Sequence, residues 1–110
     1  MNERQVVSDC IKWLRKKGWI CRRQNVGLFL TQQGTPIRLG EVGEPDWRCM
    51  RPKGGNYVEY FELEAKRPGK TPGDKQLEYM AKRKYQGFVC TWADSLPMLQ
   101  AWYRDTYGDG

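Results

Sequence analysis

The apolar positions near the start of the chain recur at the spacing of an α-helix, which we expect over residues 3–17. Asn2 can cap this helix, with Gln5 three residues later as its reciprocal partner, and Gly18 ends it. The apolar residues that share the buried face are Val7, Cys10, Ile11 and Leu14. The chain therefore begins with an amphipathic helix that needs a packing partner.

Shorter apolar or alternating segments predict strands. Residues 27–45 are rich in glycine and turn formers, which predicts a ribbon with its turn at Gln33-Gly34-Thr35. Strands are expected on either side of this ribbon and later in the chain, at 19–26, 46–50, 57–66 and 87–92. The apolar run at 87–92 is typical of a strand at the centre of a sheet.

Two more helices complete the pattern. Thr71 can cap one of them, Pro72 suits its first position, and it runs to about Tyr85. The last helix is capped by Asp94 and runs to about Tyr107. The residues expected to face inward are Leu77, Met80 and Ala81, and then Leu96, Leu99 and Trp102 or Tyr103. The order predicts one α/β domain over residues 1–110, with a mixed sheet flanked by helices.

Composition narrows the possible chemistry. The 110 residues carry 19 Lys and Arg against 13 Asp and Glu, a net charge of +6. This favours polyanionic partners, although it also serves solubility. The chain has no histidine, which excludes histidine triads and zinc sites with histidine ligands. Hydrolysis would have to use carboxylates, lysine or a metal.

The cysteines and the hydropathy pattern bear on location. The four cysteines form no Cys-x-x-Cys pair, so buried thiols in a reducing compartment are expected. No apolar run reaches the ~18 residues of a membrane helix, and the N-terminus lacks a signal-peptide apolar region. We therefore expect a cytoplasmic protein without a membrane partner.

Two short segments carry candidate catalytic groups. In the first, Pro45 fixes the backbone so that Asp46 opens a strand in a defined direction; a turn with a solvated Asp is the alternative. In the second, alternation along a strand places Glu62, Glu64 and Lys66 on one face, near the end of that strand. The alternative there is a solvated face with an ion pair that contributes little.

Two further side chains could join them. Gln76 lies four residues before Met80, where its amide could reach the end of the strand; an ordinary surface glutamine is the alternative. Glu3 lies four residues before Val7 on the buried face of the first helix, so its carboxylate is expected to point inward. A carboxylate there is costly unless it is paired or binds a metal, which makes Glu3 a candidate auxiliary acid. A frayed first-turn residue favoured by the helix dipole is the alternative for Glu3.

The spaced combination resembles the VRR-NUC branch of the PD-(D/E)xK nuclease superfamily. The matching segments cover most of the chain from the first helix to the strand at 87–92: Arg38-Leu39-Gly40, Gly43-Glu44-Pro45-Asp46, Glu64-Ala65-Lys66-Arg67-Pro68-Gly69, Thr71-Pro72 and Gln76. The resemblance implies a restriction-endonuclease-like fold with an α-β-β-β-α-β core. Glu62 departs from the family, which commonly has a small or apolar residue there. It could widen the acidic cluster, but we expect it to pair with an arginine such as Arg48 or Arg51.

The resemblance also implies roles. Asp46 and Glu64 would bind Mg²⁺ or Mn²⁺, helped by the backbone carbonyl of Ala65. Glutamate on the first helix lies near the metal in this family, which matches Glu3. Lys66 would contact the attacking water or the scissile phosphate, and Gln76 would support the site. Small stand-alone members resemble Holliday-junction resolvases, which implies a homodimer that cuts four-way DNA junctions.

Other functions stay open from the sequence. The same chemistry would serve a flap, nicking or restriction-type nuclease, and the same fold could be a non-catalytic DNA-binding module. A structural protein with a fortuitous acidic strand is a third possibility. Basic residues near the candidate groups could neutralise phosphates beside the cut. The chain has no base-reading motif, so recognition of DNA shape is expected rather than of sequence.

Overall fold

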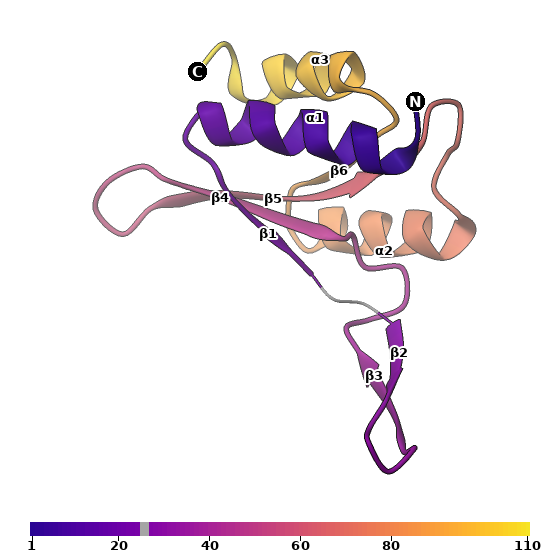
Figure 1. Cartoon of the computed structure of the whole chain (residues 1–110). Coiled ribbons are helices and arrows are strands. Elements are labelled where there is room, and N and C mark those ends of the chain that lie inside the picture. Colours follow the sequence, from indigo (N-terminus) through magenta and orange to yellow (C-terminus); the bar gives the residue numbers. More distant parts are fainter. Residues whose placement is uncertain (25–26) are drawn as a thin grey trace.

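The computed structural model describes residues 1–24 and 27–110, with the backbone alone at 27–29, 38 and 39. It is a mixed α/β fold with three helices, a four-stranded sheet and a separate two-stranded ribbon (Figure 1). The helices are α1 (Glu3–Lys16), α2 (Asp74–Tyr85) and α3 (Leu96–Tyr107). The strands are β1 (Ile20–Arg23), β2 (Gly27–Leu30), β3 (Pro36–Leu39), β4 (Trp47–Pro52), β5 (Val58–Ala65) and β6 (Cys90–Ala93).

The main sheet has the strand order β1-β4-β5-β6. β4 is antiparallel to both neighbours, and β6 is parallel to β5 because α2 connects them. The order of elements confirms the expected α/β class with a mixed sheet. The prediction that the strand near 87–92 is central was wrong, because β6 lies at an edge of this sheet. Its apolar run follows from packing against α2 on one face and α3 on the other.

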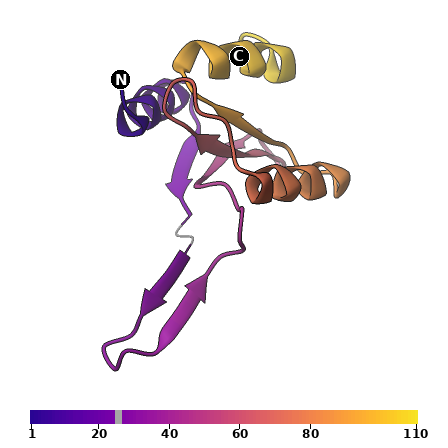
Figure 2. The ribbon, with the colours of Figure 1, turned by 90° about the vertical axis from the view of Figure 1, so that its right-hand side faces the viewer.

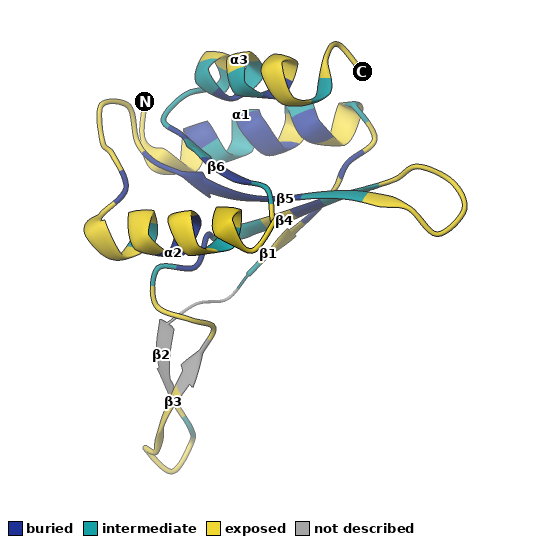
Figure 3. Cartoon of the chain, turned by 180° about the vertical axis from the view of Figure 1, so that it is seen from behind, coloured by how far each residue is buried: buried dark blue, intermediate teal, exposed yellow. Residues whose placement is uncertain are grey.

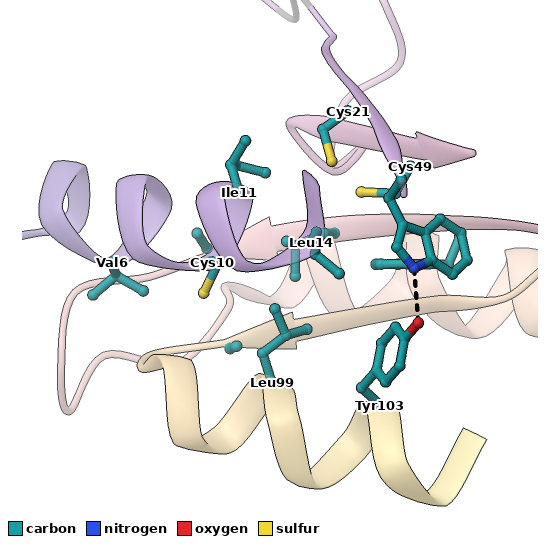
Figure 4. Close-up of a cluster of buried hydrophobic side chains, with 13 residues drawn as sticks. Val6, Cys10, Ile11, Leu14, Cys21, Cys49, Leu99 and Tyr103 are labelled. Atoms are coloured by element: carbon teal, nitrogen blue, oxygen red, sulfur yellow. Dashed lines mark hydrogen bonds between the residues drawn. The ribbon is translucent and has the colours of Figure 1, made fainter. Parts of the chain in front are cut away.

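The hydrophobic core lies between the sheet and the layer formed by α1 and α3, while α2 covers the opposite face (Figure 3). α1 contributes four fully or nearly buried residues, Val6, Cys10, Ile11 and Leu14. Val6 takes the position expected for Val7, which is only half-buried. The indole N–H of Trp19 donates to the Tyr103 hydroxyl at 2.8 Å, which ties the chain after α1 to α3 (Figure 4).

Local capping explains where the helices begin. Asn2 accepts a hydrogen bond from the Gln5 N–H at 2.9 Å, as expected, but the Gln5 side chain donates to Asp9 and leaves the capping box incomplete. α2 begins at Asp74 and not at Pro72, because the Gln76 side chain caps Gly73 instead. The expected caps that do not form are Thr71 for α2 and Asp94 for α3, where Ser95 is the cap.

The inward faces of the last two helices also differ from the prediction. In α2 the buried residues are Tyr79 and Met80, whereas Leu77 is 47% exposed and Ala81 is exposed. In α3, Leu99 and Tyr103 are buried as expected, and Leu96 and Trp102 are half-buried. Met80 is buried as expected, but the rest of the α2 prediction was wrong because Gln76 and Arg83, which contact glutamates of β5, share the side of the helix that faces the sheet.

The ribbon of β2 and β3 projects away from the body of the molecule (Figure 2). Its strands pair antiparallel and are joined by a turn in which the Gly34 N–H donates to the Thr31 carbonyl. This confirms the predicted turn at Gln33-Gly34-Thr35. Of the described helices and strands, none packs against the ribbon apart from its own two strands. No helix in the described part of the chain is both long and apolar enough to cross a membrane.

The chain returns from the ribbon to β4 by passing close to the first turn of α2. Gly43 has φ +85°, and a Cβ there would collide with the Lys75 carbonyl, within 2.7 Å of its carbon. Only glycine allows this approach, because other residues add both strain and overlap. The next residues, Glu44 and Pro45, are buried, so Asp46 enters β4 from a fixed direction.

Gly43→Ala should therefore destabilise the protein more than a glycine replacement in open space. We expect about 1–2 kcal/mol from left-handed strain and about 1–3 kcal/mol more from overpacking. Gly54→Ala is the matched control, because Gly54 has φ +90° and no heavy atom within 4 Å of an added Cβ. Urea denaturation measures both variants, and equal losses of stability would show that the contact with α2 is unimportant.

Candidate active site

Asp46 and Glu64 lie side by side at one end of the two central strands of the main sheet, where β4 begins and β5 ends. The register of β4 with β5 pairs Trp47 with Leu63, so the preceding residue, Asp46, lies opposite Glu64. The Asp46 N–H donates to Glu64 Oε2 at 3.1 Å. Lys66 follows on the same strand face, as alternation predicted, with Nζ at 3.4 Å from Glu64 Oε1. Residues that lie 18 positions apart in the chain thus share one small site.

Gln76 reaches this site from α2. Its Nε2 donates to Glu64 Oε1 at 2.9 Å, and its Oε1 accepts from the Gly73 N–H at 2.9 Å. The amide therefore has a fixed orientation, with the donor aimed at the carboxylate and the acceptor at the start of the helix. The expected hydrogen bond from Gln76 to the end of the strand is present.

Burial makes these charges costly. Glu64 is 3% exposed and Lys66 is 8% exposed. Burial, with the nearby charge of Asp46, raises the pKa of Glu64 to about 6, although Lys66 and the hydrogen bonds oppose the shift. The pKa of Asp46 is also raised, mainly by burial and partly by Glu3, against the opposing charges of Arg23 and Lys66. Two neighbouring acidic groups with raised pKa values are typical of a functional site.

The site offers oxygen ligands of the kind that hard divalent cations prefer. They are the carboxylates of Asp46 and Glu64. The backbone carbonyl of Ala65, the last residue of β5, is a further candidate ligand. In the described part of the chain, no group of three or more His, Cys, Asp or Glu side chains is placed to hold a metal. A bound cation would therefore have two acidic ligands and would complete its shell with backbone and water oxygens.

Glu3 is near this site but does not face the core. It is exposed, which corrects the expectation that its carboxylate points inward. It nevertheless lines a cavity with Asp46, and its charge contributes to the raised pKa of Asp46. The first turn of α1 therefore extends from the core to the margin of the site, and Glu3 stays a predicted auxiliary acid.

Glu62 forms the predicted ion pair, but with a different arginine. It is 1% exposed and accepts from Arg83 Nε at 2.9 Å, which is a contact between β5 and α2. The two arginines expected as its partners bind other carboxylates: Arg48 lies 3.3 Å from Glu44 and Arg51 lies 2.8 Å from Glu59. Sequence spacing within the strands could not reveal Arg83, because α2 brings it from 21 residues away.

The Glu62–Arg83 pair should be important for stability. Removing one partner of a buried ion pair leaves an unpaired charge and costs about 3–5 kcal/mol. We therefore expect Arg83→Met to lower the free energy of unfolding by about 3 kcal/mol, measured by urea denaturation. Adding Glu62→Gln to Arg83→Met should recover part of the loss. Lys82→Met, which breaks an exposed pair with Glu41, is the control; a similar loss in it would contradict the prediction.

The repulsion between Asp46 and Glu64 predicts a pH effect. The pKa of Glu64 in the folded protein, about 6, exceeds its ordinary value of 4.5. Its contribution to stability is therefore complete below pH 4.5 and is lost as pH rises through about 6. Asp46→Asn should lower the pKa of Glu64 and reduce this loss. Carboxyl NMR titration and urea denaturation in chelator measure both effects.

Glu3→Gln is the control for this titration, because Glu3 is not among the causes that shift Glu64. An unchanged Glu64 pKa in the Asp46→Asn protein would show that the two carboxylates do not interact.

The comparisons with known proteins were negative. No protein-family model, no curated protein and no solved structure matches this chain. Support for a function therefore has to come from the arrangement of Asp46, Glu64, Lys66 and Gln76 where β4 begins and β5 ends.

Proposed function

We propose that this protein is a Mg²⁺- or Mn²⁺-dependent DNA endonuclease that hydrolyses phosphodiester bonds. One observation carries the proposal: the Asp46 backbone N–H, the Lys66 ammonium and the Gln76 amide converge on the buried carboxylate of Glu64, with the Asp46 side chain beside it. The sequence of these elements, α1, β1, β4, β5, α2 and β6, is compatible with the restriction-endonuclease-like core of the VRR-NUC branch. Four buried thiols are consistent with a cytoplasmic location.

Asp46 and Glu64 would hold the cation, with the carbonyl of Ala65 as a further ligand. Both Glu64 oxygens already accept hydrogen bonds, but a carboxylate has about four lone-pair sites and retains room for a metal. The raised pKa of each carboxyl group supports the fit, since a bound cation would offset the cost of burial at both groups and the repulsion that Glu64 feels from Asp46. Such a cation lowers the pKa of bound water and neutralises charge that develops on the phosphate.

Lys66 and Gln76 have distinct roles in this proposal. Lys66 is the only ammonium in contact with Glu64 among the described ion pairs. From there it can position the attacking water or stabilise negative charge on the scissile phosphate. Gln76 would act through Glu64: it holds one carboxylate oxygen and so sets the direction of the other. It is therefore a positioning residue.

Branched DNA is the proposed substrate, and the four-way junction is the preferred form. The net charge of +6 suits a polyanion. The resemblance to small stand-alone resolvases supports a homodimer, because a junction has two equivalent strands that suit two sites on a two-fold axis. Flap or nicking activity, restriction-type cleavage and DNA binding without catalysis are the alternatives to be separated.

The test is cleavage of a four-way junction in Mn²⁺ or Mg²⁺, beside a linear duplex of the same sequence. We expect the wild-type protein to cut the junction, and Asp46→Asn and Lys66→Ala to lose at least about 10²-fold in rate. Both variants should still bind the junction in a fluorescence anisotropy assay. Asp105→Asn and Lys84→Ala are matched controls, because both residues are exposed, Asp105 on α3 and Lys84 at the C-terminal end of α2, about two turns after Gln76; they should cut at the wild-type rate.

Cleavage by the Asp46→Asn protein at the wild-type rate would refute the assignment of the site. Calorimetry adds an independent measurement: Mn²⁺ should bind the wild-type protein and bind the Asp46→Asn protein more weakly. Junction binding with neither cleavage nor metal binding would instead identify a non-catalytic DNA-binding module.

A further inference from the structure

The candidate site lies in a row that is formed by the ends of all four strands of the main sheet. β1 ends at Arg23 beside the start of β4, and β5 and β6 both end in the same row. Asp46 and the Glu64–Lys66 segment therefore occupy the middle of the row. Neighbouring strands lie about 4.8 Å apart, so the row spans roughly 14 Å from β1 to β6.

One end of the row carries two arginines. Arg4 and Arg23 line a cavity of about 230 Å³ whose wall includes Asp46. Arg4 comes from the first turn of α1 and Arg23 from the last residue of β1, and both are exposed. Two guanidinium groups, with five donors each, thus lie beside the acidic centre.

The other end carries a basic loop. Residues 67–71 line a hollow of about 520 Å³ directly after Lys66. The loop has a defined shape, since Asp94 accepts from the Gly69 N–H at 3.1 Å and the Lys70 N–H donates to the Arg67 carbonyl at 3.0 Å. Arg67 and Lys70 are both exposed. Because Asp94 immediately follows β6, this loop lies at the β6 end of the row.

These four basic residues differ from the arginines within the fold. Arg48, Arg51 and Arg83 each contact a glutamate. Among the described ion pairs, in contrast, none includes Arg4, Arg23, Arg67 or Lys70. Their positive charges are therefore available to an anion from outside the protein, on both sides of an acidic centre that would otherwise repel a polyanion.

We propose that one DNA strand runs along this row of strand ends. Arg4 and Arg23 bind a phosphate on one side of the scissile phosphate, and Arg67 and Lys70 bind a phosphate on the other side. The row is longer than the ~3.4 Å axial rise per phosphate of one DNA strand, so its two ends reach different phosphates. The inference rests on the proposed nuclease function, because that function places the scissile phosphate in the middle.

Binding tests the row without cleavage, in the Asp46→Asn background. Arg23→Ala and Lys70→Ala should each weaken junction binding by about 3–10-fold and reduce the slope of log K against log salt by about 0.9. Lys84→Ala is the matched control, because it removes an exposed lysine in the last turn of α2, at the end of the helix that lies away from Gln76 and the row. An unchanged affinity and slope in either row variant would overturn the proposal.

Single neutral methylphosphonates, placed at one phosphate after another along a strand through the branch point of the junction, test the direction. The Arg23→Ala penalty should vanish on one of these substrates, and the Lys70→Ala penalty should vanish on a different one. Loss of both penalties on the same substrate, or of neither penalty on any substrate, would refute the two-sided path. If wild-type protein cuts no DNA but the two penalties still separate, the phosphate row stands and the nuclease function fails.

Discussion

The Glu64 carboxylate is the group on which the site depends. It accepts from the Asp46 N–H, from Gln76 and from Lys66, and so links β4, β5 and α2. A buried carboxylate without such donors would be expelled or protonated. The same contacts leave Glu64 with a raised pKa, because burial and Asp46 outweigh the favourable partners. The ionised form of Glu64 is therefore destabilised at this site, and packing elsewhere in the fold has to offset that cost.

The support comes from the way α2 packs on the sheet. Gln76 contacts Glu64, and Arg83, two helical turns later, contacts Glu62 two residues earlier on β5. α2 therefore runs antiparallel to β5, and two polar contacts hold it on the sheet together with the buried Tyr79 and Met80. Arg83 also lies 3.6 Å from the ring centroid of Phe88, which adds a cation–π contact. Glu62 thus has a structural role next to the site.

Much of this arrangement follows from local pattern. The alternation of β5 is enough to place Glu64 and Lys66 on one face, and the position of Gln76 relative to Met80 correctly indicates an amide that reaches the strand. The sequence patterns did not predict contacts that depend on residues far apart in the chain. Leu77 is exposed because the side of α2 that faces the sheet is formed by other residues, namely Gln76, Tyr79, Met80 and Arg83. Gly43 is required only because the loop meets the Lys75 carbonyl.

The sequence by itself determined the order of elements, the mixed α/β class and the set of candidate catalytic residues, since periodicity, turn chemistry and spacing are properties of neighbouring residues. The tertiary structure decided which distant residues meet. It made Arg83 the partner of Glu62 and put Glu3 at the margin of the site. It also made β6 a lateral strand of the sheet and brought Arg23, Asp46 and Lys66 into one row at the strand ends. Strand order and helix packing control these contacts, and both arise from burial across the whole chain.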